Sequence, residues 1–398
     1  AGGEPVAPTH DAGDVTALRR AARTPYVLPR PTEQGAADGA LLLTGATGFL
    51  GGPLLVALRS AVDRPLICLV RAPDDGAAHA RLSDRLGGRV PAGVTVVAGD
   101  VGRPDLGLSP GVRARLERSV ATVVHAAAEV DMVRSEAALS ATNVGGVRNI
   151  LRFSCTARPK HLHHVSTLGV FVAGDRAAGI VREYDDPERA TRVFGGYART
   201  KWAAEMVAHH AAGRVPLATH RLGLLTGDSR TGRGSDRDQL TLALRGLAAL
   251  RCVPAAPPAL RFDVTPVDVA AGALARLVAV EATGPFHLAH PGGGATVDQL
   301  YEAIRRAGVT LDTVDESVWR SRASASPPVG VEAAAAWLGL RRAVGPGSGR
   351  LRGLDLFLAT GVHFDRARLD AALAGTDVRW PSDLDDLLER YARVAIAR

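Results

Sequence analysis

Residues 40 to 51 read Ala-Leu-Leu-Leu-Thr-Gly-Ala-Thr-Gly-Phe-Leu-Gly, and this stretch decides the fold. Its apolar half predicts a buried strand, and its glycines predict a tight turn that leads into a helix. Gly45 would allow the sharp turn, Gly48 would let a pyrophosphate approach bare backbone, and Gly51 would let the helix pack close to the sheet. Because the unpaired amides of such a helix start can face phosphates, the stretch indicates a dinucleotide-binding loop. Taken alone, it could also be a plain turn before a surface helix.

Beyond this stretch, short apolar runs alternate with helix-length segments. The runs cover residues 41–43, 66–70, 94–97, 122–125, 162–165 and 217–220. Such runs are typical of buried parallel strands joined by right-handed crossovers, so we expect an α/β protein with a Rossmann-type, doubly wound sheet. We expect three parts: a linker or N-terminal arm over 1–39, with a short amphipathic piece at 15–22; a nucleotide-binding domain over 40–225, with returning segments from the C-terminal half; and a smaller, mainly helical subdomain over 226–398.

Composition narrows the class of protein. The 398 residues are 46% hydrophobic and 22% charged, which is typical of a globular protein. No apolar run is long enough to cross a membrane and no signal peptide is visible, so we expect a cytoplasmic protein without a membrane partner. The chain starts at an alanine, which indicates a segment cut from a longer protein, and we expect it to be monomeric.

The net charge of +7 comes almost entirely from arginine. Since no basic run is interleaved with aromatics, we expect no nucleic-acid binding.

Two groups of residues invite a metal-site interpretation, and neither has ligand spacing. The chain has three cysteines, Cys68, Cys155 and Cys252. Their odd number and wide spacing predict ordinary buried thiols. In the run His161-Leu-His-His, strand alternation would place His161 and His163 on one face and His164 on the other, with no carboxylate or cysteine in a ligand pattern. We therefore expect no metal.

An arginine, Arg71, follows the second apolar run, twenty residues beyond the last glycine of the loop. In a dinucleotide fold this position reads the adenosine ribose: an acid would bind a free 2′-hydroxyl, whereas an arginine pairs with a 2′-phosphate. Arg71 therefore favours NADPH over NADH. Arg81 could add a second charge or could be a solvated helix residue. We interpret Asp74 and Asp75 as first-turn acids of the next helix.

The residues that follow the third and fourth apolar runs also indicate a cofactor at the carboxyl edge of the predicted sheet. Asp100 follows the third run, where it could meet the adenine edge or act as a plain turn residue. Ala126, Ala127 and Ala128 follow the fourth run, and their small side chains would leave room for a flat ring beside the sheet.

The residues that carry the predicted chemistry come next. Ser166 and Thr167 end the fifth run, and Tyr197 and Lys201 follow about thirty residues on in Tyr-x-x-x-Lys. Residues four apart project from one face of a helix. A lysine ammonium near a phenol would lower its pKa towards neutrality and make Tyr197 a proton donor. The hydroxyl of Thr167, or with less support that of Ser166, could hold the substrate oxygen.

These motifs resemble those of the extended short-chain dehydrogenases/reductases. They are more closely similar to the terminal thioester reductase domains of nonribosomal peptide and polyketide synthases, which are similar to the reductase domain of carboxylic acid reductases. The similarity covers nearly everything from Leu41 to the C-terminus. The motifs that carry it are Thr-Gly-Ala-Thr-Gly-Phe-Leu-Gly (44–51), Leu-Val-Arg-Ala (69–72), Gly-Asp-Val (99–101), Asn-Val-Gly-Gly (143–146), Val-Ser-Thr (165–167), Gly-Tyr-Ala-Arg-Thr-Lys-Trp-Ala-Ala-Glu (196–205) and Asp-Val-Thr-Pro-Val-Asp (263–268).

The resemblance implies NADPH on the first glycine motif, with Arg71 and Arg81 reading the 2′-phosphate. It also implies a catalytic triad of Thr167, Tyr197 and Lys201, the last two touching the cofactor as well. Further residues implied to line the cofactor are Thr44, Thr47, Phe49, Leu50, Val101, Asn143, Ser166, Leu222, Gly223 and Leu224. The family usually has a proline after the arginine that follows the sixth strand, where this chain reads Arg221-Leu222-Gly223.

The implied activity is reductive release of an acyl or peptidyl chain from the phosphopantetheine arm of a carrier protein. The product would be an aldehyde or, after a second reduction, an alcohol. Two alternatives stay open. One is another extended short-chain dehydrogenase, such as a nucleotide-sugar epimerase or dehydrogenase, which Arg71 disfavours because those enzymes usually take NAD. The other is a non-catalytic dinucleotide-binding scaffold, which would not need Tyr197 and Lys201.

The second half is expected to form the substrate lid and carrier-docking surface. Thr265 is predicted to cap a helix over 267–280, with Asp268 as a structural first-turn acid. A helix around 240–250 is apolar on more than one face, which fits ordinary core or an acyl channel. Loops are expected at 320–330 and 344–352, and a helical close over 364–391.

Overall fold

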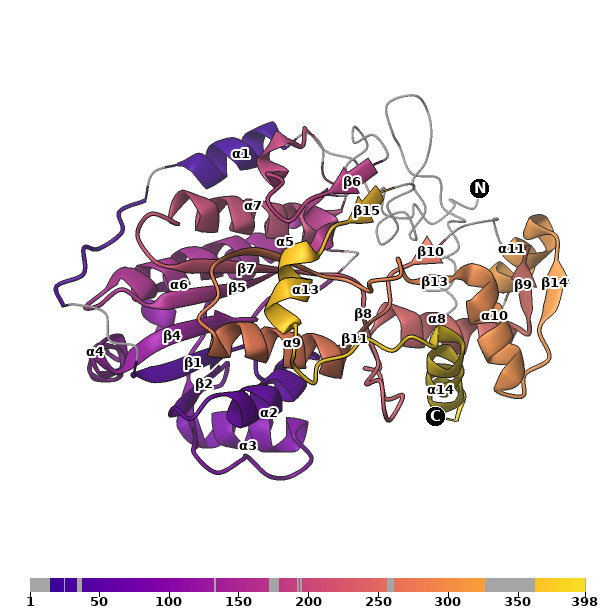
Figure 1. Ribbon diagram of the computed structural model, residues 1–398, viewed down its shortest axis with the longest axis horizontal. Helices are drawn as coiled ribbons and strands as arrows, with labels where there is room; N and C mark the ends of the chain where they lie inside the picture. Colours follow the sequence, from indigo (N-terminus) through magenta and orange to yellow (C-terminus); the bar gives the residue numbers. More distant parts are fainter. Residues whose placement is uncertain are drawn as a thin grey trace, which may run out of the picture.

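A parallel sheet forms the centre of the molecule. The computed structural model describes residues 15–24, 26–33, 38–131, 134–171, 179–191, 193, 195–255, 261–325 and 362–397. Within them, seven strands pair in parallel in the order β12-β7-β5-β4-β1-β2-β3 (Figure 1). These strands are β1 (Ala40–Thr44), β2 (Leu66–Val70), β3 (Val94–Ala98), β4 (Val120–His125), β5 (His161–Thr167), β7 (Leu217–Leu222) and β12 (Gly284–Leu288). The predicted doubly wound sheet is confirmed, and all six predicted runs lie in strands.

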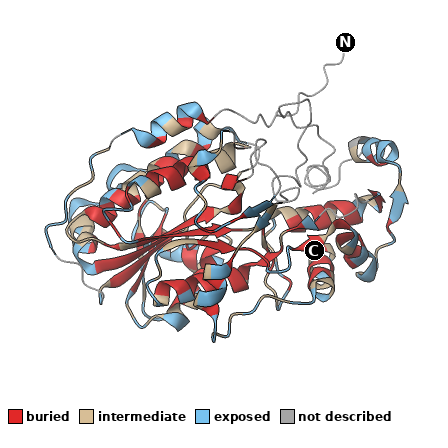
Figure 2. Ribbon diagram, turned by 45° about the horizontal axis from the view of Figure 1, so that its top comes forward, coloured by how far each residue is buried: buried red, intermediate tan, exposed pale blue. Residues whose placement is uncertain are grey.

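Helices cover both faces of this sheet and create two separate cores. On one face lie α2 (Gly51–Ala61), α3 (Asp75–Arg85), α9 (Val267–Ala279) and α13 (Ala367–Leu373). On the other lie α1 (Thr16–Arg23), α4 (Pro110–Ser119), α6 (Gly146–Cys155) and α7 (Gly196–His210). Since both faces are covered, strands β1, β2, β4 and β7 are buried along their whole length (Figure 2). This double burial is why β1 and β2 appear in the sequence as nearly continuous apolar runs, whereas β7 also buries Thr219, His220 and Arg221.

A smaller, mainly helical unit lies at one end of the sheet (Figure 1). Its helices are α8 (Gln239–Leu250), α10 (Val297–Arg306), α11 (Glu316–Ala325) and α14 (Leu384–Ile396). They enclose a third core, to which α8 contributes Leu240, Leu244 and Leu247. The apolar face of α8 is therefore used as core, the more ordinary of the two alternatives for this helix.

Short elements connect these layers. They are β6 (Gly179–Val181), β8 (Leu225–Thr226), β9 (Cys252–Pro254), β10 (Arg261–Phe262), β11 (Thr265–Pro266), β13 (Ala295–Thr296), β14 (Asp312–Val314), β15 (Val362–Phe364), α5 (Glu136–Ser140), the π-helical turn η2 (Ala141–Gly145) and the 3₁₀ turns η1 (Pro104–Gly107), η3 (Leu168–Phe171) and η4 (Pro187–Arg189). Among the described residues, each helix is too short or too polar to span a membrane.

Two local predictions are wrong. Thr265 does not cap α9, because its hydroxyl donates to Asp263 (2.6 Å) and the helix starts after Pro266 without a side-chain cap. Residues 320–325 are helical within α11, not a loop, while 326–330 and 344–352 lie outside the described residues. Asp268 is structural as predicted: its carboxylate accepts hydrogen bonds from the amide and hydroxyl of Ser229 (2.8 and 2.6 Å).

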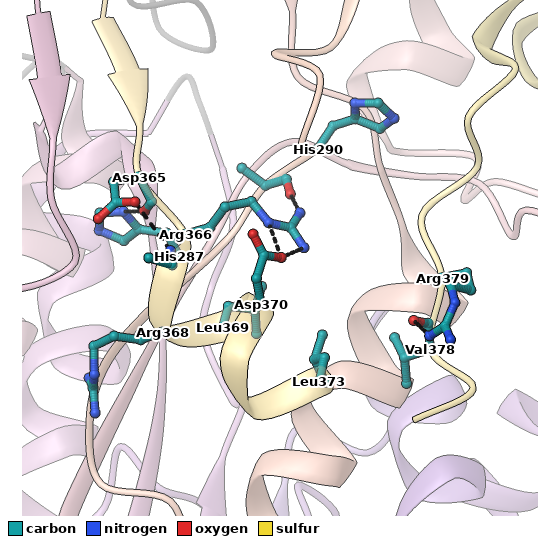
Figure 3. Close-up of polar contacts among 12 residues, drawn as sticks. His287, His290, Asp365, Arg366, Arg368, Leu369, Asp370, Leu373, Val378 and Arg379 are labelled. Atoms are coloured by element: carbon teal, nitrogen blue, oxygen red, sulfur yellow. Dashed lines mark hydrogen bonds and ion pairs between the residues drawn. The ribbon is translucent and has the colours of Figure 1, made fainter. Parts of the chain in front are cut away.

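The C-terminal region returns to the edge strand β12. The sequence analysis did not identify this strand. β15 pairs in parallel with β6, and α13 follows it. His287 of β12 shares a hydrogen bond with the carbonyl of Asp365 (2.8 Å), and Arg366 pairs with Asp370 (2.7 Å), as Figure 3 shows. The guanidinium of Arg368 donates to the carbonyl of Thr283 (2.8 Å). The edge strand is therefore held from outside by a segment about eighty residues later in the chain.

Candidate active site

The glycine loop between β1 and α2 is shaped by close backbone packing. Gly45 has φ +79°, and a Cβ there would lie 2.6 Å from the amide nitrogen of Ala127. A Cβ at Gly51 would overlap the carbonyl of Gly45. At Gly48, by contrast, only the Gly45 carbonyl lies near, at 3.1 Å. Two glycines thus fix the turn, and the third leaves an open approach to the backbone next to a helix that starts without a side-chain cap.

Thr44 supports this loop from within. Its buried hydroxyl shares a hydrogen bond with Nδ1 of His125 (2.8 Å) and accepts one from the amide of Ala127 (3.2 Å). It therefore ties the end of β1 to the end of β4 and leaves Ala126, Ala127 and Ala128 partly exposed at that edge. The geometry gives Thr44 a structural role. The three small alanines follow β4, at the strand end where we expected room for a flat ring.

Three arginines gather beside the loop. Arg71 is exposed at the end of β2, and Arg81 donates to its carbonyl (2.8 Å). One turn further along α3, Arg85 donates to the carbonyl of Gly48 (3.3 Å). Sequence analysis missed Arg85, although its i+4 spacing from Arg81 was visible. Three arginines therefore lie at or near the glycine loop, each on or beside α3.

The nearby acids do not compete for this site. Asp74 caps α3 by accepting from the amide of Ala77 (2.8 Å), and Asp75 accepts from the amide of Ala98 in β3 (2.7 Å). Both are used as helix-start acids, as predicted.

The Asp100 and Asn143 side chains are occupied within the protein. The Asp100 carboxylate accepts a hydrogen bond from the amide of Gly102 (2.9 Å), and this bond closes a turn. Val101, between them, is buried. Asn143 donates to the carbonyl of Glu129 and the hydroxyl of Thr200 (3.0 Å each). The geometry supports a structural role for Asn143, which joins the segment after β4 to α7.

The predicted catalytic residues meet at the carboxyl end of β5. Lys201 donates its ammonium proton to the carbonyl of Val165 (2.6 Å), which ties α7 to β5 two residues before Thr167. Tyr197 lies one turn earlier on α7 and is partly exposed. The hydroxyl of Thr167 accepts from the amide of Gly169 (3.1 Å). The Lys201 ammonium and the Thr167 hydroxyl therefore lie at the carboxyl end of β5, and Tyr197 lies in the first turn of the helix that brings Lys201 there.

The predicted lowering of the Tyr197 pKa is wrong. Although part of the residue is exposed, the surrounding protein shields the Tyr197 phenol from water and raises its pKa to about 12, because the phenolate is poorly solvated there. Burial also lowers the pKa of Lys201 to about 8, with Glu205 opposing that shift. Tyr197 is thus protonated at neutral pH without help from the lysine.

Behind these residues lies a buried charged pair that the sequence did not reveal. Arg221 on β7 donates to Glu205 on α7 from Nε and Nη2 (2.8 and 2.6 Å), and Ser166 donates to the other carboxylate oxygen (2.6 Å). Burial alone would raise the pKa of Glu205, but Arg221, with smaller contributions from His209 and Ser166, outweighs it and the net pKa is lowered. Because the Ser166 hydroxyl is engaged by Glu205, the Thr167 hydroxyl is the better placed of the two to hold a substrate oxygen.

The segment after β7 is held by Asp263. This carboxylate accepts from the amide of Leu224 (2.8 Å), and a Cβ at residue 223 would collide with it. Gly223 itself donates to the carbonyl of Leu288 (2.9 Å). Leu222, which stands where the family usually has proline, is therefore followed directly by a glycine against which the Asp263 carboxylate packs.

The three cysteines and most of the 161–164 histidine run are buried, with His161 partly exposed. His161 and His163 stack at 4.4 Å between ring centroids, while His164 stacks on His125 at 5.7 Å. This is the alternation that the sequence predicted. The three cysteines are buried free thiols, also as predicted. Over the described part of the chain, no three histidine, cysteine or acidic side chains come together in a way that could hold a metal.

Comparison with known proteins agrees with this geometry. Residues 43–274 match the NAD-binding family described as "Male sterility protein". An isonitrile lipopeptide synthase of Streptomyces coeruleorubidus is 33% identical over 324 residues, which are 77% of this chain and 21% of that protein. Carboxylic acid reductase of Mycobacterium marinum is 31% identical over 323 residues, which are 71% of this chain and 27% of that protein.

A solved structure matches over almost its full length. The crystal structure of the terminal R domain from the myxalamid PKS-NRPS biosynthetic pathway is 30% identical, with a TM-score of 0.81, and the match covers 95% of this chain and 96% of that one. The chain spans less than a third of the length of the two curated relatives described above.

Proposed function

Because the chain belongs to the thioester reductase domains of the extended short-chain dehydrogenase/reductase superfamily, we propose that it uses NADPH to release a thioester-bound acyl or peptidyl chain as an aldehyde. The observation that carries the proposal is the meeting of two half-sites at one sheet edge. The glycine loop and the Arg71 cluster lie on one side, and Thr167, Tyr197 and Lys201 lie on the other. The thioester would be carried on the phosphopantetheine arm of a carrier protein.

The residues present fit a phosphorylated dinucleotide. Gly48 leaves the loop backbone open, Arg71 is exposed at the end of β2, and the guanidinium groups of Arg81 and Arg85 reach the backbone of Arg71 and of Gly48. An arginine cluster at this position suits a 2′-phosphate, which is absent from NADH. When bound, the nicotinamide supplies a hydride to the thioester carbonyl carbon.

The protein's part in the reaction is to hold the carbonyl and to deliver a proton. Thr167 and Tyr197 donate hydrogen bonds to the carbonyl oxygen, where negative charge develops. Because its pKa is about 12, Tyr197 keeps its proton until that charge forms and then transfers it to the oxygen. The ammonium of Lys201 stabilises the phenolate left behind.

The products follow from the balance of atoms. One hydride on carbon and one proton on oxygen convert the thioester to a hemithioacetal. Breaking its carbon–sulfur bond then gives an aldehyde and returns a thiol on the carrier arm. A second hydride and proton would give the alcohol.

The test is release from a loaded carrier. The chain is mixed with NADPH and a carrier protein that bears an acyl thioester, the released product is identified by mass, and the NADPH consumed is counted. We expect one NADPH per aldehyde and no reduction of the matching free acid, because thioesters are the activated form. Reduction of the free acid without ATP, or release of acid with no NADPH consumed, would contradict the proposal.

A further inference from the structure

The first turn of α7, which carries Tyr197, lacks a built-in cap. Its N-cap residue is Gly195, whose φ is +74° and which has no side chain to accept from the first-turn amides. Uncapped helix starts fray, so the position of a residue in the first turn depends on what packs against it. Tyr197 is the second residue of this helix. Its placement therefore needs support from outside α7.

The segment 187–191, just before this turn, rests on α7. Trp202, fully buried on α7, donates its indole proton to the carbonyl of Pro187 (2.8 Å). The turn η4 closes through a hydrogen bond from the amide of Ala190 to the carbonyl of Pro187 (3.1 Å). One side of the segment is thus fixed to the middle of α7.

The other side of segment 187–191 is held by α1. Arg19 donates from Nη2 to the carbonyls of Glu188 (2.8 Å) and Ala190 (2.6 Å). Its guanidinium also lies 5.6 Å from the ring centroid of Trp202. The amide of Val15 donates to the carbonyl of Thr191 (3.2 Å). Because α1 packs through its buried Leu18 and Ala22 into the same core as α7, this clamp is anchored.

We propose that Arg19 is a positioning residue: by holding segment 187–191 against Trp202, it fixes the first turn of α7 and aims the Tyr197 hydroxyl. Among the described residues, the side-chain contacts of Arg19 are with segment 187–191 and Trp202, not with the glycine loop. The activity readout rests on the proposed function, whereas the structural readout below does not.

The test compares Arg19→Ala with Arg20→Ala, its neighbour on the exposed face of α1. In Arg19→Ala we expect kcat to fall about tenfold or more, because a small misplacement of a catalytic group slows the chemical step. NADPH affinity should stay within about twofold, since the glycine loop is untouched. Backbone amide exchange should speed up in residues 196–201 and stay unchanged in 40–61. Arg20→Ala should match the wild type in all three.

Arg19→Lys serves as the second variant, because it keeps the charge, the aliphatic stem and donors for the two carbonyls but lacks the planar guanidinium that lies over the ring of Trp202. We expect a smaller loss of kcat than in Arg19→Ala. Unchanged kcat with unchanged exchange in 196–201 would overturn the proposal. So would equal losses of kcat and NADPH affinity with faster exchange throughout the sheet, which would indicate general destabilisation. If the wild type reduces no thioester, the proposed function fails, and exchange in 196–201 still decides whether Arg19 holds this turn.

Discussion

The glycine-loop half of the site and the Tyr197 half are built in different ways. The first comes mainly from one stretch, residues 40–101, in which α3 folds back so that Arg85 reaches Gly48. Strand β4 adds one tie to it, through the hydrogen bond between His125 and Thr44. The second half is assembled from more segments: Lys201 on α7 reaches β5 at Val165, and Arg19 on α1 reaches Ala190 across 171 residues of chain. The cofactor half is therefore encoded largely in one stretch, whereas the placement of Tyr197 and Lys201 draws on α1, β5 and α7 together.

This difference predicts how each half responds to substitution. Changes in the cofactor half should alter affinity and leave turnover of the saturated enzyme intact. Changes in the Tyr197 half should alter turnover or the free energy of unfolding and leave cofactor affinity intact.

The largest expected effect is at Tyr197. Tyr197→Phe removes only the hydroxyl, so kcat should fall by about 10² to 10⁴, the usual share of general acid catalysis. NADPH affinity, measured by fluorescence titration, should be unchanged. Tyr184→Phe is the matched control, because Tyr184 is 71% exposed and its ring would stay in place for Arg368. Near-normal turnover of Tyr197→Phe would place the proton donor elsewhere.

The buried pair behind the site should matter for stability. Arg221→Met leaves the Glu205 carboxylate buried without its partner, which should cost about 3 to 5 kcal/mol in urea unfolding. Arg230→Met, on an arginine with an 82% exposed side chain, should change the free energy of unfolding by less than about 0.5 kcal/mol. Equal effects of the two substitutions would remove the distinction between a buried and a surface pair.

In the cofactor half, Arg71→Gln should change cofactor preference. A charge-assisted pair with the 2′-phosphate is worth about 1.5 to 3 kcal/mol, so kcat/KM for NADPH should fall about tenfold or more. The value for NADH should hardly move. Arg89→Gln, exposed beyond the end of α3, is the control. Wild-type kcat/KM values that are equal for both cofactors would show that the arginines do not read the 2′-phosphate.

The buried histidines predict a loss of stability in acid. Burial, with Lys201 adding to it, lowers the pKa of His164 well below its usual value, and neither ring nitrogen has a partner within the described structure. The unfolded chain takes up that proton below about pH 6.5 while the fold does not, so stability falls as pH falls. His164→Leu should reduce the slope of unfolding free energy against pH, between pH 6 and 5, by about 1.4 kcal/mol per unit. An unchanged slope would contradict this.

Features set by local sequence could be predicted, whereas features set by tertiary contacts could not. The turn at Gly45, the position of Arg71 after β2 and the six strand runs were predictable because spacing and apolar runs report local geometry. The helical spacing of Tyr197 and Lys201 was predictable in the same way, but the direction of the Tyr197 pKa was not, because it depends on burial in the folded protein. Strand β12 was missed since it begins Gly-Pro, a turn signal, and owes its place to pairing with β7.

The central claim, that a hydride passes from the cofactor to the thioester carbonyl, is tested most directly by isotope transfer. NADPH carrying deuterium on one or the other face of the nicotinamide C4 is used in parallel with an acyl thioester on a carrier protein. The account predicts that one of the two labels appears at the aldehyde carbon, one deuterium per molecule released. An aldehyde without deuterium from either label, or release of the free acid, would contradict it.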